Sequence, residues 1–227
     1  MKAFIIMFNR LTWPQKLCAD LEKSGCEVIL IDNGSTYPPL LEWYKNCPYK
    51  IHYIKNLGSR SLWLSGIINQ YSDRYYIVTD HDLDISQLPN DWIDVLMKGF
   101  EIQSITKSGL SLQIDDLPDN KFANEVKDFE SRFWETMTGG YYSAPIDTTL
   151  AIYDRERMNG IRFPFDFEDD SHSRFFNALR SPKPYQAKHL TWYNTPDSIT
   201  EEEKYYMAHI GNDGFWTRHF IETWKQQ

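Results

Sequence analysis

The stretch YIVTDHDLDI, which begins at Tyr76, ends an apolar run with acids at every second position, Asp80, Asp82 and Asp84. On an extended backbone Asp80 and Asp82 would point to one side and His81 to the other. Carboxylates that lie close together raise one another's pKa unless a cation lies among them. Oxygen ligands at this spacing suit Mg²⁺ or Mn²⁺. The stretch therefore predicts a divalent-metal site at the end of a buried strand.

Two other interpretations of these acids stand beside the metal site. A calcium loop of the EF-hand type would need glycine where Ile85 stands and glutamate where Asp91 stands, and a helix in front of it. The second alternative is a solvated turn that caps a helix beginning near Pro89. The polar turns that precede the stretch favour the metal site.

The elements that must position these acids alternate along the first 80 or so residues. Continuous apolar runs predict buried strands at residues 3–8, 26–32, 50–54 and 74–80. Helical patterns lie between them at residues 11–25, 39–47 and 59–71. This alternation favours an α/β fold, a Rossmann-like and mostly parallel sheet with helices on both faces.

The second half of the chain is less regular. Strand patterns occur at residues 109–115 and 148–154, and helical patterns at 120–137, 201–210 and 214–226. We find no internal repeat, low-complexity run or obvious linker, so we expect a single domain over residues 1–227.

In open α/β sheets ligands bind at the carboxyl ends of the strands. Polar turns follow all four early strands, with the sequences FNR, DNGST, KNLGSR and DHDLD. The first turn has no glycine, and neither GxGxxG nor GxxxxGK[ST] occurs in the chain. A phosphate bound here would therefore be neutralised through a divalent cation rather than by a glycine-rich loop.

Composition excludes other classes of partner and site. The net charge of −8, with no block of lysine or arginine, lacks the positive footprint of nucleic-acid binding. Cys18, Cys26 and Cys47 have no paired spacing, which is typical of reduced thiols in a cytoplasmic protein. No apolar run approaches the roughly 18 residues of a transmembrane segment. The amphipathic run FWTRHFIETW is expected to pack on the domain, with peripheral contact to a membrane as the alternative.

Three stretches, VILIDNGST, NLGSRSLWLSGI and YIVTDHDLDI, resemble the nucleotide-binding turns and DxD element of GT-A glycosyltransferases, particularly the family-2-like group. Later, APIDTTLAIY resembles the strand that faces the acceptor in small bacterial and viral members, and YQAKHLTWY the segment that supplies a late histidine. The resemblance implies a GT-A domain whose residues 1–90 bind the nucleotide and whose residues 91–227 bind the acceptor and end in helices.

The resemblance also implies which residues contact the nucleotide sugar. They are Asn9, Arg10, Asp32, Asn33, Asn56, Gly58, Arg60, Asp80 and His81. Asn9 and Arg10 would border the nucleoside, Asp32 would accept hydrogen bonds from the base or ribose, and Arg60 would reach the base or a phosphate. The guanidinium of Arg60 could meet phosphate oxygens in a bidentate manner, and its alternative role is that of a surface arginine.

The metal ligands implied by the resemblance are Asp80, Asp82 and His189, around Mn²⁺ or Mg²⁺. A neutral imidazole can join two carboxylates around Mn²⁺. Asp84 is a less favoured third acid, and the alternative for His189 is a packed histidine beside Trp192.

Inverting transfer needs a carboxylate that takes the proton of the attacking hydroxyl. Asp147 stands at the mouth of an apolar strand, where burial of a charge is costly without a task or partner. Asp169, beside Glu168, is the second candidate, although such acids are also typical of a helix N-terminus.

We therefore expect a metal-dependent glycosyltransferase that moves a sugar from a nucleotide-diphosphate donor, with a UDP-sugar favoured, to a hydroxyl of a glycan or lipid-linked acceptor. Two alternatives remain open. One is a sugar nucleotidyltransferase, and the other is a non-catalytic sugar- or metal-binding module.

Overall fold

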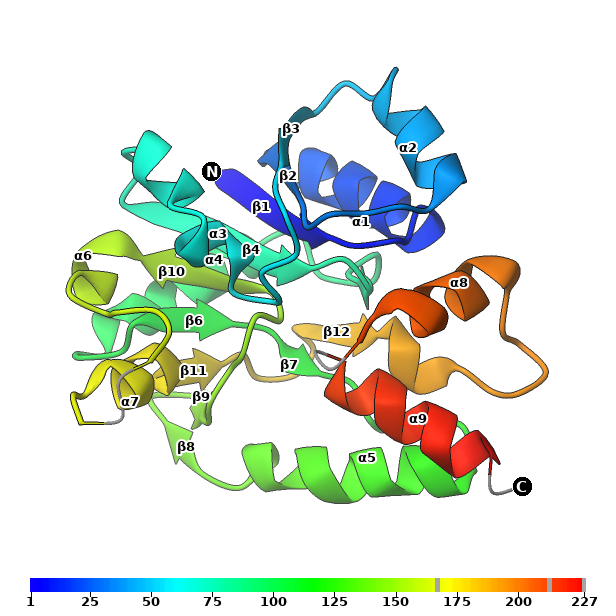
Figure 1. Cartoon of the computed structure of the whole chain (residues 1–227). Helices are drawn as coiled ribbons and strands as arrows, with labels where there is room; N and C mark the ends of the chain where they lie inside the picture. The colour runs from blue at the N-terminus through cyan, green and yellow to red at the C-terminus, as the bar shows by residue number, and fades with distance from the viewer. Residues whose placement is uncertain (166–167, 212–213, 226–227) are drawn as a thin grey trace.

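The computed structural model describes residues 1–165, 168–211 and 214–225, with the backbone only at 224 and 225. Its centre is a sheet with the strand order β3-β2-β1-β4-β10-β6-β11-β9-β8 (Figure 1). The strands are β1 (Lys2–Met7), β2 (Glu27–Asp32), β3 (Lys50–Tyr53), β4 (Tyr75–Asp80), β6 (Lys107–Gly109), β8 (Met137–Thr138), β9 (Tyr141–Ser143), β10 (Ala151–Asp154) and β11 (Ala178–Arg180).

The first four strands are parallel, as their sequence pattern predicts. β1 lies between β2 and β4, with Met7 opposite Asp32 and Ile6 opposite Asp80. The other half of the sheet is mixed, because β10 runs antiparallel to both β4 and β6 while β11 is parallel to β6. The fold is α/β with a Rossmann-like sheet, and its parallel strands deliver Asp32 and Asp80 to the same edge.

Helices cover both faces of this sheet (Figure 1). They are α1 (Thr12–Lys23), α2 (Pro38–Tyr44), α3 (Ser61–Leu64), α4 (Trp92–Lys98), α5 (Lys121–Ser131), α6 (Arg155–Met158), α7 (Ser171–Phe176), α8 (Glu201–His209) and α9 (Phe215–Lys225). The helix expected at residues 59–71 is divided, because Gly66 has a φ of 73° and a 3₁₀ turn follows at Ile67–Gln70. None of the helices in the described part of the chain is long and apolar enough to cross a membrane.

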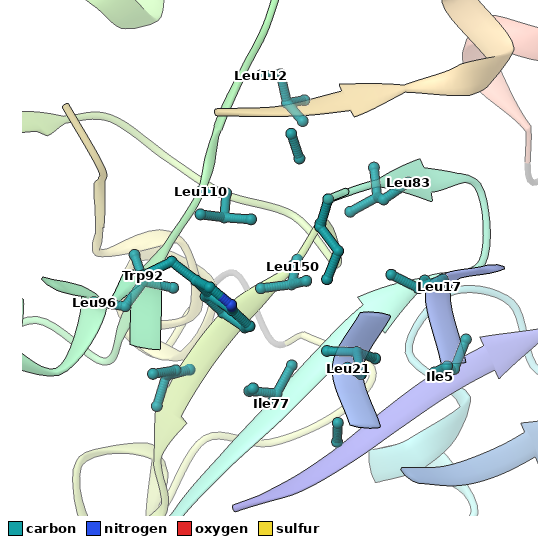
Figure 2. Packing of buried hydrophobic residues seen from close by; sticks show 14 of the residues in the cluster. Ile5, Leu17, Leu21, Ile77, Leu83, Trp92, Leu96, Leu110, Leu112 and Leu150 are labelled. Carbon is teal, nitrogen blue, oxygen red and sulfur yellow. The ribbon is translucent and has the colours of Figure 1, made fainter. Parts of the chain in front are cut away.

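Alternate residues of β1 pack into two separate cores. Ile5 joins a cluster with Leu17 of α1 and Trp92 of α4, which Figure 2 shows from close by. Phe4 joins the opposite cluster with Leu62 of α3. The continuously apolar pattern of the strand therefore reflects burial on both faces.

A small second sheet joins distant parts of the chain. It has the order β5-β12-β7, with β5 at Leu83–Asp84, β12 at Gln186–His189 and β7 at Ser111–Leu112. β12 pairs antiparallel with β5, so His189 lies opposite Leu83. The amide of Leu190 then donates to the carbonyl of Asp82 over 2.8 Å. This sheet is the reason that the late histidine segment reaches the acidic turn.

Candidate active site

A cavity of about 210 Å³ lies at the carboxyl ends of the parallel strands. Its described lining includes the predicted residues Asn33, Asn56, Gly58, Asp80, His81, Asp82, Asp147 and His189. Tyr206 of α8 and Trp216 of α9 close its other side. The structure therefore brings much of the predicted site together around one cavity.

Asp80 is the last residue of β4, and residues 81 and 82 form a bend. Because the strand ends here, the simple alternation expected for the three residues does not apply, and all three line the cavity. Thr148 donates its hydroxyl to Oδ1 of Asp80 over 2.8 Å. Burial, together with the nearby Asp82 and Asp147, raises the pKa of Asp80 to about 8. The surroundings of Asp80 thus disfavour its ionised form.

Asp82 has the opposite electrostatic environment. Its Oδ2 accepts hydrogen bonds from Arg10 over 3.0 Å and from Thr191 over 2.6 Å, and lies 3.7 Å from Nδ1 of His189. Burial alone would raise the pKa of Asp82, but His189 and Arg10 outweigh it and hold that pKa well below its usual range. Asp82 is therefore a buried, ionised carboxylate.

Arg10 does not occupy the position expected for a nucleoside contact. Its side chain is fully buried, and it is not among the described residues that line the cavity. Nε and Nη2 each donate to a carboxylate oxygen of Glu203 over 2.7 Å, and the guanidinium lies 3.5 Å from the ring centre of Tyr206. Arg10 therefore fastens Asp82 to α8.

His81 is buried and fixed by the same region. Its Nδ1 lies 2.9 Å from the carbonyl of Ile6 and its Nε2 lies 3.5 Å from Nη1 of Arg10. Burial and the charge of Arg10 lower the pKa of His81 to about 4. His81 lines the cavity as a neutral imidazole.

The predicted metal ligands are His189, Asp80 and Asp82. No set of three or more His, Cys, Asp or Glu side chains among residues 1–165, 168–211 and 214–225 is arranged to hold a metal ion. The predicted triad is thus not preassembled. The donor chemistry nevertheless fits, because Nδ1 of His189 is buried without a hydrogen-bond partner and the three side chains line one cavity.

The turns after β2 and β3 are joined by Asn33. Its Oδ1 accepts from the amide of Leu57 over 2.8 Å, and its Nδ2 donates to the carbonyl of Gly58 over 3.0 Å. Gly58 has a φ of 73°, which favours glycine. Asn56 is exposed beside it and accepts from the Gly58 amide. These turns form one wall of the cavity.

Asn9 and Asp32 shape this wall from behind rather than line the cavity. Asp32 is buried and accepts from the Tyr44 hydroxyl over 2.9 Å and from the Ser35 amide over 3.2 Å. Asn9 has a φ of 49° and accepts from the amide of Thr36 over 2.6 Å. Both residues thus hold the DNGST turn, and their expected contacts with the nucleoside stay a prediction.

A second, larger cavity of about 590 Å³ adjoins the first. Aromatic and apolar side chains dominate its described lining, including Phe129, Phe133, Phe176, Trp192, Phe215 and Trp216. Its charged pair, Arg180 and Glu130, is internally neutralised over 2.8 Å. Asp80, Asp147, His189, Phe215 and Trp216 line both cavities. The two spaces therefore meet at the acidic turn.

Asp147 stands at this junction with its side chain 58% exposed. A terminal nitrogen of Arg60 lies 3.8 Å from its Oδ1. Arg60 itself packs over the ring of Phe165 at 4.6 Å and is not among the described residues lining either cavity. The structure thus puts Arg60 beside Asp147 rather than in the first cavity.

Asp169 is placed differently from the expectation for a base. Its Oδ1 accepts from the amide of Ser171 over 2.8 Å, at the start of α7. It is not among the described residues that line either cavity. Asp169 therefore serves the helix N-terminus, which is the alternative that its sequence context offers.

Several residues of the site escape sequence reasoning. Thr148 and Thr191 bind the two aspartates, and Glu203 and Tyr206 enclose Arg10. Thr148 directly follows Asp147 and Thr191 follows His189 by two positions, so proximity to a predicted residue was the available signal. Glu203 lies in an acidic run, EEE, that gives no sign of burial.

The sequence matches no protein-family model and no curated protein. Among solved structures it is similar to a mannosyltransferase, PcManGT from Pyrobaculum calidifontis, in complex with GDP-Man and Mn²⁺. The two align with a TM-score of 0.51 and 15% identity over 92% of this chain and 61% of that one. At this identity the likeness establishes the fold alone, and the present chain spans less than two thirds of the mannosyltransferase.

Proposed function

We propose that this chain is a glycosyltransferase that moves a sugar from a nucleotide-diphosphate donor to a hydroxyl of a glycan or lipid-linked acceptor. The observation that carries the proposal is the meeting of two cavities at Asp80, Asp147 and His189. Polar turns at strand ends and aromatic residues of α8 and α9 line the first cavity, whereas aromatic rings dominate the lining of the second. A transferase needs such a junction, because two substrates must meet at one set of catalytic groups.

The donor would lie in the first cavity, against Asn33, Asn56, Gly58 and His81. Asp80, Asp82 and His189 would hold Mn²⁺ or Mg²⁺, which would neutralise the charge of the diphosphate. The PcManGT complex, which contains GDP-Man and Mn²⁺, supports a nucleotide sugar and a divalent cation as the ligand classes.

The acceptor would lie in the second cavity, where aromatic faces can stack on sugar rings. Asp147 would take the proton of its attacking hydroxyl, in an inverting reaction. Asp147 suits this task because its exposed carboxylate lies where the cavities join, whereas the carboxylate of Asp169 accepts from the first amide of α7.

A thermal-shift panel tests the donor class. It includes UDP-, GDP- and dTDP-sugars with and without Mn²⁺, because the uridine donor implied by the sequence resemblance and the GDP-mannose of the solved neighbour differ in the base. We expect one nucleotide sugar to raise the melting temperature only with Mn²⁺, and to release its nucleoside diphosphate on incubation. Release of pyrophosphate from a nucleoside triphosphate and a sugar phosphate would identify a nucleotidyltransferase instead. Binding without any turnover would identify a non-catalytic module.

A further inference from the structure

Beneath Asp147 lies a buried lysine that the proposed reaction does not use. Lys107 of β6 is fully buried, and its Nζ donates to the backbone carbonyl of Asp147 over 2.9 Å. The same Nζ lies 3.6 Å from the ring centre of Phe175, a cation–π arrangement. Burial lowers the pKa of Lys107 well below its usual value, which makes this a costly place for a lysine.

A second buried donor reaches the same carbonyl. The hydroxyl of Tyr153 in β10 donates to the Asp147 oxygen over 3.0 Å, and Tyr153 is also fully buried. Lys107 and Tyr153 are direct cross-strand neighbours in the antiparallel pairing of β6 and β10. One carbonyl oxygen has two lone pairs and so can accept both hydrogen bonds.

The residues next to Asp147 are also held by hydrogen bonds. Nε of Arg180 donates to the carbonyl of Pro145 over 3.0 Å, and the hydroxyl of Thr148 donates to Asp80. The exposed carboxylate of Asp147 therefore projects from a backbone that is held from below by the rigid sheet. A proton acceptor that must lie within hydrogen-bond reach of a hydroxyl needs such support, because small displacements are costly in rate.

We propose that Lys107 and Tyr153 form a positioning pair that fixes Asp147 at the junction of the two cavities. Neither residue touches substrate, because both are fully buried, so they act through the backbone of Asp147. This inference rests on the proposed function for its catalytic consequence. The effect of the two hydrogen bonds on the Asp147 backbone can be measured without any substrate.

Tyr153→Phe is the sharper variant, because it keeps the buried ring and removes one donor. Tyr76→Phe is its matched control. The ring of Tyr76 stacks on that of Tyr153 at 5.6 Å, and its hydroxyl accepts from Trp63 instead of serving Asp147. Lys107→Met is the second variant and removes the other donor.

Two measurements are made on the full chain. In Tyr153→Phe and Lys107→Met, amide hydrogen exchange in residues 144–150 should be at least about fivefold faster than in the wild type, with β4 unchanged. Tyr76→Phe should leave the exchange rate of residues 144–150 at its wild-type value. With UDP-glucose and GDP-mannose as probes, kcat should fall about fivefold or more while the donor KM stays constant.

Unchanged exchange in residues 144–150, or a general loss of protection in all variants alike, would overturn the positioning pair. So would faster exchange together with a wild-type kcat. If the wild-type chain turns over neither probe, the proposed function fails for these donors. The exchange data then still decide whether Lys107 and Tyr153 hold the segment.

Discussion

Arg10 and Asp82 form a buried ion pair in which Nη1 donates to Oδ2 over 3.0 Å, with side chains 0% and 7% exposed. Glu203 of α8 also binds this guanidinium. One cation therefore pairs with a carboxylate of the turn after β4 and with a carboxylate of α8. A buried charge left without its partner is far more costly than one that keeps it. The candidate metal-binding turn and the C-terminal helices are thus stabilised together.

Arg10→Met should destabilise the protein by about 3–5 kcal/mol, because it leaves two buried carboxylates without their cation. Urea unfolding followed by circular dichroism measures the change. Arg60→Met is the matched control, since Arg60 is 34% exposed and lies 3.8 Å from its acidic partner, and we expect it to cost about 1 kcal/mol or less. Equal stability of the two variants would contradict the role assigned to Arg10.

The stability of the metal-free protein should fall as pH rises from 6.5 to 8. Asp80 keeps a proton in the folded state up to a pKa of about 8, whereas the unfolded chain loses it near 3.8. His81 has the opposite sign, because its pKa falls from 6.5 to about 4 on folding and so adds stability as pH rises within that interval. The two effects oppose each other below pH 6.5, and above it the loss due to Asp80 remains.

Asp80→Asn should remove this loss. For one proton the free energy of unfolding changes by at most about 1.4 kcal/mol per pH unit. This value is the upper limit on the difference in pH dependence between the wild-type protein and Asp80→Asn. Urea unfolding at pH 6.5 and pH 8 in the presence of a chelator measures it. Identical pH dependence of the wild type and the variant would show that the carboxyl of Asp80 is not held in its protonated form.

Asp147→Asn should lower turnover by about a hundredfold or more, because an amide cannot accept the proton of the hydroxyl. Donor affinity, measured by calorimetry with Mn²⁺, should stay within about twofold of wild type. Asp169→Asn is the control and should turn over normally, since the side-chain oxygen of asparagine can also accept from the Ser171 amide. If Asp169→Asn were the inactive variant, the base would have to be reassigned.

Phe133→Ala should weaken acceptor binding and leave donor binding unaffected. The reason is that Phe133 lines the second cavity and is not among the described residues that line the first. Loss of one aromatic stacking contact corresponds to a rise of about tenfold in the acceptor KM. Trp134→Ala tests whether the effect is local. Trp134 is the adjacent residue, packs edge-on against Tyr142, and is not among the described residues that line either cavity. A similar rise in both variants would assign the effect to loosening of this turn.

Local patterns predicted much of the fold, because buried parallel strands and their turns are encoded by neighbouring residues. The strand ending at Asp80, the DNGST turn and the flanking α1 follow from apolar runs and turn chemistry. The division of the helix at Gly66 and the short length of β10 were not predicted, since tertiary packing decides where such elements end.

The least predictable part of the site is its set of long-range polar partners. Arg10 and Glu203 are 193 positions apart, and the first amide of α1, that of Thr12, donates to Glu202 rather than to a residue of the helix itself. An arginine after a strand has the same appearance whether it faces a ligand or a buried carboxylate. Only the docking of α8 distinguishes the two cases.

The most direct measurement is diffraction from a crystal that holds Mn²⁺ and a nucleotide sugar, either UDP-glucose or GDP-mannose. We expect a manganese anomalous peak among Asp80, Asp82 and His189, with the sugar directed toward Asp147. A bound nucleotide sugar with no manganese in that cavity, or with its sugar remote from Asp147, would contradict it.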